Sequence, residues 1–382
     1  MSDSSIPGAR LFRLCFVCSL LSLASAMHSS ALAEDNATVR IGWVGAMSGA
    51  VAKYGAYEAA TLAAEDINNT GGIAGRKLEL RFQDAKCNGR DALTAMSQLT
   101  NIEKVKFIVG GHCSTESLAI APLAERSKTI MVAAITSSPK LSDAGDYIFR
   151  VTAPNIEGAK LLLEHANAKH LKRLGVVYEE TEYAQGLAEY VKSESSAYGL
   201  EVVAFDGFAP GETDLRTLVT RLKSAAVDAI YFSPQAADGS ITFLKSAREQ
   251  QLSVPILGNE IAGNSVKAIK DAASLFDGII FAEPQFDTRA PALVDFEKRY
   301  KERFHVPALP YGFYTCEAYD AVSILADTIA KCGDDPQAVK KCLYEISDYQ
   351  GLSGKIAFNA KGDGIRHYVK KQVKDGAIQP FE

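Results

Sequence analysis

The segment with the clearest capacity to bind a small ion covers residues 107–117 and reads FIVGGHCSTES. The β-branched apolar run up to Val109 predicts a short buried strand, two glycines end it, and Ser114 starts a helical pattern. This order places free backbone N–H groups and the positive end of a helix dipole at the carboxyl end of a strand. Because the segment contains no Lys or Arg, a bound anion would be held by dipoles. The alternative is a helix N-cap that binds nothing.

Hydroxyl-bearing residues also follow two other predicted strands. Ser48 comes after the strand at 39–44, and Thr136, Ser137 and Ser138 come after the strand at 129–134. Each of these alone is most often a turn or a cap residue. Together with Ser114 they favour a cradle for an anion, built from three neighbouring strand ends.

A ligand that also carries an ammonium group needs a carboxylate, because an unpaired buried charge is very costly. Glu260 is the candidate, since it follows the predicted strand at 254–257 and therefore also lies at the carboxyl end of a strand. The alternative is a solvated loop glutamate. Tyr54 and Tyr183 lie in Gly- and Ala-flanked loops and could cover an apolar side chain, although isolated aromatic residues usually serve packing.

The elements that position these residues alternate between strand and helix. Alternation of this kind is typical of a parallel, doubly wound α/β sheet. A first series ends with a strand at 147–151, and a second series follows a plausible crossover at 152–155. The first series has strands at 39–44, 77–83, 105–109 and 129–134 and helices at 57–67, 90–101 and 118–126. The second has strands at 173–178, 201–208, 229–232, 254–257 and 278–281 and helices at 156–168, 184–198, 215–224 and 240–250. Three helical patterns at 292–303, 313–331 and 337–346 and a strand-rich tail complete the chain.

Length and composition agree with two domains and argue against a nucleic-acid surface. The chain has 382 residues, more than one hydrophobic core usually serves. Its net charge of −5, its single Trp and its scattered lysines provide neither a basic patch nor a stacking platform, so no nucleic-acid partner is expected.

The N-terminus has the pattern of a secretory signal peptide. Arg10 and Arg13 precede an apolar run at 14–26, and small residues follow, with cleavage expected after Ala33. Two alternatives are a membrane anchor, for which the run is short, and lipid attachment at Cys15 or Cys18. We therefore expect residues 1–33 to be removed and the mature protein to lie in an exported compartment.

The remaining cysteines suit an oxidising compartment. Cys87 and Cys113 each follow a strand of the first series, so both are expected at one sheet edge, and we predict a disulfide between them. Cys332 and Cys342 flank a turn between two helical patterns, and we predict a second disulfide there. Cys316 is then left over as a buried free thiol. A zinc site is the alternative, but the sequence has no C-x-x-C pair and its histidines are scattered, so no metal is expected.

Motifs of common enzyme classes are missing from the sequence. There is no G-x-S-x-G, no Walker P-loop, no G-x-G-x-x-G after a strand and no H-E-x-x-H. The sequence therefore favours a binding protein without a cofactor over an enzyme, although a triad assembled from distant segments stays an alternative.

Six segments in order along the chain resemble the leucine/isoleucine/valine-binding proteins of bacterial periplasms. These segments are VGAMSGAVAKYG at 44–55, AEDINNTGGI at 64–73, GGHCS at 110–114, EYAQG at 182–186, DGFAPGE at 206–212 and GNE at 258–260. The resemblance implies two Rossmann-like lobes joined by a three-strand hinge, with the ligand enclosed between them, and delivery to a membrane ABC permease complex. The expected boundaries are 34–152 and 284–358 for lobe 1, and 153–283 and 359–382 for lobe 2. The resemblance also implies that the exported protein is periplasmic.

Carried over by position, the resemblance assigns a role to each candidate site residue. Ser114 and the segment Ile135, Thr136 and Ser137 would bind the ligand carboxylate, and Glu260 would bind the ammonium. Tyr54 and Tyr183 would line the pocket, and Cys87 and Cys113 match the disulfide of the family.

This sequence also departs from the family pattern. Ile135, Thr136 and Ser137 stand where relatives show Ala-Ala-Thr, and the sequence YFSPQ at 231–235 stands where relatives carry a pocket tyrosine. The expected protein is a monomeric solute-binding protein for a branched-chain or related aliphatic amino acid. The alternatives are the same fold with an aromatic or other small carboxylate or amide as ligand, or an exported ligand sensor.

Overall fold

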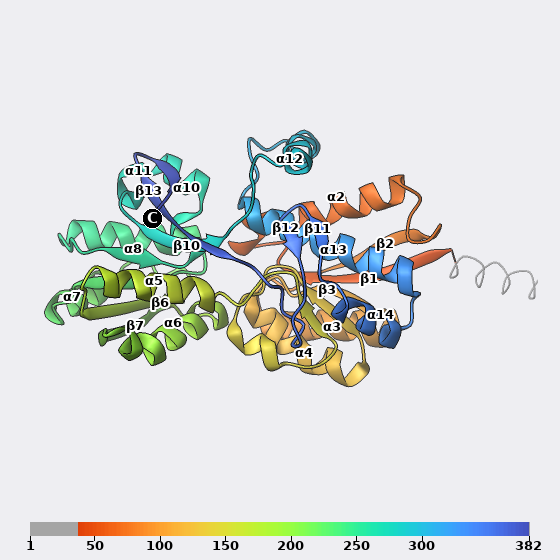
Figure 1. Ribbon diagram of the computed structural model, residues 1–382, viewed down its shortest axis with the longest axis horizontal. Helices are drawn as coiled ribbons and strands as arrows, with labels where there is room; N and C mark the ends of the chain where they lie inside the picture. Colours follow the sequence, from red (N-terminus) through yellow and green to blue (C-terminus); the bar gives the residue numbers. More distant parts are fainter. Residues whose placement is uncertain (1–36, 382) are drawn as a thin grey trace, which may run out of the picture.

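The protein, described from a computed structural model over residues 37–381, contains two α/β units (Figure 1). The predicted signal peptide, with Cys15, Cys18 and the cleavage site after Ala33, lies outside the described residues. Each unit has its own central sheet, and a further two-stranded sheet is formed by β11 and β12.

The first sheet is fully parallel, with the strand order β2-β1-β3-β4-β5. Strands β3 and β4 are buried along their whole length, because helices cover both faces of a parallel sheet. The strands are β1 (Thr38–Gly45), β2 (Lys77–Asp84), β3 (Phe107–Gly110), β4 (Ile130–Ala133) and β5 (Ile148–Arg150).

Helices from distant parts of the chain cover the two faces of this sheet. One face, which includes Trp43, packs with α2 (Ala56–Asn69), α13 (Gly312–Cys332) and α14 (Pro336–Tyr344). The other face packs with α3 (Gly89–Ser97) and α4 (Ser114–Ser127). Three short helical turns lie beside these helices: η1 (Val51–Tyr54), η2 (Gln98–Ile102) and η3 (Pro139–Asp143). The C-terminal helices therefore complete the core of the N-terminal unit.

The second sheet has the order β14-β13-β10-β9-β8-β6-β7, so its five parallel strands repeat the order of the first sheet. Its strands are β6 (Arg173–Glu179), β7 (Glu201–Phe208), β8 (Ala229–Ser233), β9 (Ile256–Gly258), β10 (Ile280–Pro284), β13 (Tyr368–Lys374) and β14 (Ala377–Pro380). The tail strand β13 pairs antiparallel with β10, and β14 pairs antiparallel with β13.

Helices cover both faces of the second sheet as well. One face packs with α5 (Ile156–Ala168) and α6 (Glu182–Glu194), which η4 (Ser195–Tyr198) extends. The other face packs with α7 (Arg216–Ser224), α8 (Ala237–Glu249), α10 (Val266–Asp271) and α11 (Ala273–Phe276). The short helix α9 (Glu260–Gly263) follows β9 directly.

The chain passes between the two sheets three times (Figure 1). The first passage follows β5 and leads to α5. The second leads from β10 to α12 (Pro291–Phe304), and the third leads from the hairpin of β11 (Tyr349–Gly351) and β12 (Gly354–Ile356) to β13. Asp363, in the third passage, pairs with Arg150 at the end of β5. The domain boundaries expected from the sequence stay a prediction.

The expected element order agrees with the structure, and the differences lie at element ends. Helix α4 begins at Ser114, where the helical pattern was expected to open, and so includes four residues before the apolar range 118–126, because Glu116 caps the helix and its first turn carries no apolar residue. The helix expected at 90–101 changes to the π turn η2 after Ser97. The sequence analysis also missed α9, α10 and α11, which are too short to show a helical period.

Both predicted disulfides are present in the structure. Cys87 and Cys113 are joined with 26 residues of separation, and Cys332 and Cys342 with 10. Cys316 is a buried free thiol.

Candidate ligand-binding site

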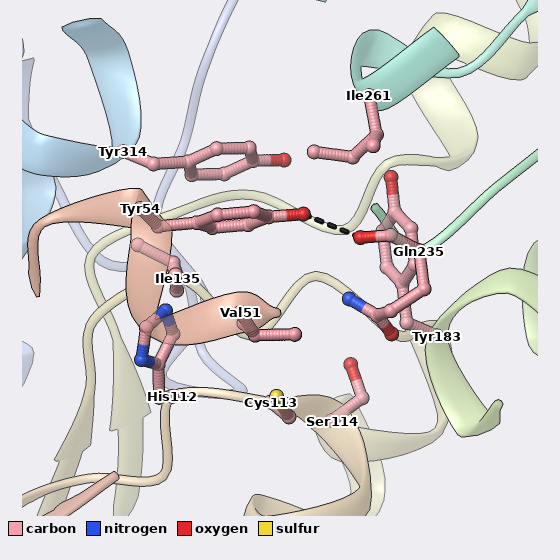
Figure 2. A pocket seen from close by; sticks show the side chains of 10 residues that line it. All are labelled: Val51, Tyr54, His112, Cys113, Ser114, Ile135, Tyr183, Gln235, Ile261 and Tyr314. Atoms are coloured by element: carbon pink, nitrogen blue, oxygen red, sulfur yellow. Dashed lines mark hydrogen bonds between the residues drawn. The ribbon is translucent and has the colours of Figure 1, made fainter. Parts of the chain in front are cut away.

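A small cavity lies where the carboxyl ends of strands from both sheets face each other (Figure 2). In the first sheet this is the edge where β1 and β3 adjoin, the point at which the strand order reverses and where open α/β sheets bind ligands. The cavity measures about 10 Å³, which is room for about one water molecule. It is lined by Val51, Tyr54, His112, Cys113, Ser114 and Ile135 of the first unit, by Tyr183, Gln235 and Ile261 of the second, and by Tyr314 of α13. A larger ligand requires these side chains to separate.

Ser114 is the first residue of α4, and its buried side chain lines the cavity. The loop before it is held by the carboxylate of Glu116. This carboxylate accepts hydrogen bonds from the backbone N–H groups of Cys87 (2.7 Å), His112 (2.8 Å) and Cys113 (2.8 Å). Burial nevertheless raises the pKa of Glu116 to about 7. The Cys87–Cys113 disulfide and Glu116 thus fix the helix N-terminus together.

Only part of the segment predicted to bind a carboxylate faces the cavity. Ile135 lines it. The Thr136 hydroxyl is instead bonded to Ser117 Oγ (2.6 Å) and to the Gly111 carbonyl oxygen (3.1 Å). Ser137 is buried, and its hydroxyl has no hydrogen-bond partner within residues 37–381. Neither Thr136 nor Ser137 lines the cavity.

The backbone of this segment is held from behind by Arg150, which is fully buried. Its guanidinium group donates to the carbonyl oxygens of Thr136 (3.2 Å) and Ser138 (2.7 Å) and forms an ion pair with Asp363 (2.7 Å). One side chain therefore ties the candidate carboxylate cradle to the third passage between the units.

Glu260 is the first residue of α9 and is buried. Its Oε1 atom accepts a hydrogen bond from the Tyr183 hydroxyl (2.9 Å) and another from the Tyr314 hydroxyl. Burial raises the pKa of Glu260, and the two tyrosine hydrogen bonds oppose that rise. The carboxylate itself does not line the cavity, but both of its tyrosine partners do.

Tyr54 reaches from the first unit to the second. Its hydroxyl donates to the backbone carbonyl oxygen of Gln235 (Figure 2). Its ring packs against Tyr311 at 4.2 Å between centroids. Ion pairs also join the units: Lys53 pairs with Asp238 (3.3 Å), and Lys140 pairs with Glu182 (3.1 Å) and Glu189 (3.9 Å). The described arrangement is therefore one in which the two units are in contact across the cavity.

Sequence reasoning named Ser114, Ile135, Tyr54 and Tyr183, all of which line the cavity. It did not assign a site role to several other lining residues, namely Val51, His112, Gln235, Ile261 and Tyr314. His112, Gln235 and Ile261 lie beside predicted strand ends, so the strand pattern could have suggested them. No local signal points to Tyr314, because α13 reaches the site from the C-terminal part of the chain.

The described chain offers neither a metal site nor a membrane span. Within residues 37–381, no group of three or more His, Cys, Asp or Glu side chains is arranged to hold a metal ion. Over the same range, no helix combines the length and the apolar character needed to cross a bilayer.

Comparison with known proteins identifies the family. Residues 38–377 match the family model described as periplasmic binding protein. The Leu/Ile/Val-binding protein of Escherichia coli (strain K12) is 30% identical over 89% of this chain and 91% of its own length. A leucine-, isoleucine-, valine-, threonine- and alanine-binding protein of Pseudomonas aeruginosa is 29% identical over 88% of this chain and 89% of its own.

Solved structures show the same fold. A leucine binding protein from Thermotoga maritima superposes with a TM-score of 0.80 at 24% identity, covering 90% of this chain and 98% of that one. A solute binding protein from Rhodopseudomonas palustris in complex with 3,4-dihydroxy benzoic acid superposes with a TM-score of 0.78 at 19% identity, covering 90% and 96%. The family is one of solute-binding proteins and not of enzymes. With a family match over residues 38–377, this chain belongs to the periplasmic binding proteins, and its fold is their two-lobed α/β architecture.

Proposed function

We propose that this protein captures a branched-chain or related aliphatic amino acid between its two units and delivers it to a membrane ABC importer. The observation that carries the proposal is the pair Ser114 and Glu260. Ser114 lines the cavity from the first unit, and Glu260 lies behind Tyr183 and Tyr314 on the side of the second unit. A neutral donor set and a single carboxylate are thus separated by a small space, as a zwitterion requires.

The carboxylate of the ligand would lie at the N-terminus of α4. That end presents free backbone N–H groups, the positive end of the helix dipole and the Ser114 hydroxyl. The backbone of Ile135–Ser137 borders the same place, held by Arg150. Because Thr136 already bonds Ser117, we assign its role to the backbone and not to its hydroxyl.

The ammonium group of the ligand would be bound by Glu260. A buried carboxylate with two hydroxyl donors is already satisfied, so the ligand must displace at least one tyrosine hydroxyl. Charge favours the exchange, since an ammonium interacts more strongly with a carboxylate than a neutral hydroxyl does. Tyr54 and Tyr183 would then cover the ligand side chain.

Closure of the two units explains how such a ligand is retained. Each unit supplies only part of the contacts, so the ligand stabilises the closed arrangement by its differential affinity for it. The hinge would be formed by the three segments in which the chain passes between the units. We place the lobe boundaries in these segments, between residues 152 and 153, 283 and 284, and 358 and 359. We further propose export by the signal peptide at 1–33, cleavage after Ala33 and a monomeric mature protein.

A thermal-shift screen tests the function directly, because a ligand that binds only the folded state raises its melting temperature. Leucine, isoleucine and valine should each raise the melting temperature in proportion to the logarithm of their concentration. The amines that lack the carboxylate, such as isoamylamine, should not. If none of the three amino acids shifts the melting temperature, the proposal is wrong.

A second candidate ligand is a small aromatic carboxylate. It is favoured by the tyrosine rings that crowd the cavity: Tyr54 packs on Tyr311 at 4.2 Å and lies parallel to Tyr314 at 6.0 Å. It is also favoured by Glu260, whose carboxylate can stay bonded to two hydroxyls when the ligand brings no ammonium. Benzoate and 3,4-dihydroxybenzoate belong in the same screen, and a shift by these alone would select this candidate.

A further inference from the structure

A purely aliphatic ligand side chain would favour a uniformly apolar wall. The wall of this cavity also contains polar side chains. His112, from the loop before α4, and Gln235, from the loop before α8, both line it. His112 belongs to the first unit and Gln235 to the second, so a ligand enclosed between the units would contact both. Val51, Ile135 and Ile261 supply the aliphatic part of the same wall.

His112 has unused hydrogen-bonding capacity. Only 3% of the residue is exposed, and neither ring nitrogen makes a hydrogen bond of normal geometry within the part of the chain that the structure describes. Burial lowers the pKa of His112 to about 4, and the Ala46 backbone opposes this shift. The ring is therefore neutral at pH 7, with one N–H donor and one acceptor nitrogen. Even with the donor turned to Ala46, the acceptor nitrogen has no partner.

Packing alone does not require an imidazole at this position. The His112 ring lies below the Tyr54 ring, at 5.7 Å between centroids and 63° between planes (Figure 2). A leucine side chain fills similar space against a tyrosine without bringing two buried nitrogen atoms that need partners. The cost of burying them is offset when a ligand supplies the missing hydrogen bond.

Gln235 provides a second polar group, on the side of the cavity opposite His112. The Tyr54 hydroxyl donates to the backbone carbonyl oxygen of Gln235, so this hydrogen bond does not use the side-chain amide. Figure 2 shows the amide end turned toward Val51. A carboxamide has two N–H donors and an accepting oxygen, so the Gln235 side chain can both donate to and accept from a ligand hydroxyl.

The polar groups on this wall are neutral. None of the ten lining residues, all within the described chain, is Asp, Glu, Lys or Arg. A charged ligand side chain would consequently be buried without a counterion. His112 lies two residues before Ser114, the first residue of α4, and both side chains line the cavity, so a group that bonds to His112 must lie close to the ligand carboxylate and its α-carbon.

From this juxtaposition we infer that the ligand side chain carries a neutral hydrogen-bonding group, a hydroxyl on a β-branched amino acid, which bonds to His112 and Gln235. This inference rests on the proposed function and narrows it to a hydroxyl-bearing member of the branched amino acid size class. Threonine and valine form the decisive pair, because they have nearly the same shape and differ in a hydroxyl against a methyl group.

The test is isothermal titration of the protein, freed of bound amino acids by dialysis, with threonine and with valine at pH 7. Threonine should bind about tenfold more tightly than valine, because valine leaves buried polar groups of the site without a partner. The variants His112→Leu and Gln235→Leu should each bring the ratio of the valine to the threonine dissociation constant closer to one. Valine should bind to these variants at least as tightly as to the unmodified protein. His165→Leu is the matched control: this buried histidine of α5 packs against Phe381, and its loss should leave the ratio unchanged.

The outcomes separate the inference from the proposed function. Valine binding as tightly as threonine to the unmodified protein would overturn the inference, while binding that still depends on Glu260 would keep the amino acid function. A threonine preference that persists unchanged in both variants would also overturn it, because the hydroxyl would then be bonded elsewhere. If neither threonine nor valine binds, the inference is overturned, and binding of leucine or isoleucine in the thermal-shift screen then decides the proposed function separately. The ratio for the unmodified protein is decisive even if a variant fails to fold.

Discussion

The hydroxyl of Tyr183 donates a 2.9 Å hydrogen bond to Oε1 of Glu260, 77 residues away in sequence. Two residues that lie after different strands of the second unit are thereby joined beside the cavity. The Tyr314 hydroxyl, from a helix that packs on the first sheet, donates to the same oxygen atom. The single buried carboxylate proposed to bind an ammonium group is thus positioned by both units.

Replacing Glu260 with Gln should sharply weaken binding of a free amino acid. The substitution keeps the shape of the side chain but removes the charge that pairs with the ammonium, which typically costs about 2–5 kcal/mol of binding free energy at a buried site. Titration calorimetry of the variant measures this. Glu180→Gln is the control, since Glu180 is exposed and follows β6, another strand of the same sheet. Equal affinity in the Glu260 variant would remove Glu260 from the site.

Glu116 should make stability depend on pH in a recognisable direction. Its pKa rises from an ordinary value of 4.5 to about 7 in the folded state. The folded state therefore binds more protons than the unfolded state in this window, and the free energy of unfolding falls as pH rises from about 4.5 to 7. The full effect is on the order of 3 kcal/mol.

In the variant Glu116→Gln the side chain cannot ionise, so the free energy of unfolding should not show this decrease as pH rises. Urea unfolding at pH 5 and at pH 8 should show the variant gaining stability relative to the unmodified protein as pH rises. His112, with its lowered pKa of about 4, acts in the opposite direction between pH 4 and 6.5, so the comparison must be made between variant and parent at each pH. A difference between them that stays constant with pH would contradict the assignment.

The two disulfides should differ in their effects. Chain entropy predicts that removal of the Cys87–Cys113 disulfide, with its separation of 26 residues, lowers the free energy of unfolding by roughly 3–4 kcal/mol. Removal of the Cys332–Cys342 disulfide, with its separation of 10, should lower it by roughly 2–3 kcal/mol. The double variant Cys87→Ser/Cys113→Ser should also weaken ligand binding, because Cys113 adjoins Ser114 at the cavity.

The double variant Cys332→Ser/Cys342→Ser serves as its control, with the affinity expected to be unchanged. Denaturant unfolding and titration of the same samples measure both quantities. Equal loss of affinity in the two double variants would show that the first disulfide has no special role at the site.

Arg150→Lys should destabilise the protein by about 3–5 kcal/mol, because a lysine cannot replace the several hydrogen bonds of a buried guanidinium and leaves Asp363 poorly paired. Affinity should fall as well, since Arg150 holds the backbone of Thr136 and Ser138. Lys140→Gln removes an exposed ion pair between the units and should change stability by less than about 1 kcal/mol. Similar stability losses in the two variants, measured by urea unfolding, would contradict this reasoning.

The fold could be predicted well from the sequence. Alternating strand and helix patterns gave the order of elements, and glycine-rich turns marked where strands end, because both signals depend on neighbouring residues. The ends of elements were less certain. Helix α4 starts at Ser114 because the carboxylate of Glu116 caps backbone groups that include Cys87, which is distant in sequence.

The sequence by itself determined which residues stand at the carboxyl ends of parallel strands, Ser114 and Glu260 among them, since strand topology places all such ends at one edge. Only the tertiary structure decided which of their side chains face the cavity. Thr136 turns to Ser117, whereas His112, Gln235 and Tyr314 complete the wall. The physical reason is that the direction of a side chain is set by what packs against it. At this site the packing partners come from two units and from a helix about 200 residues further along the chain.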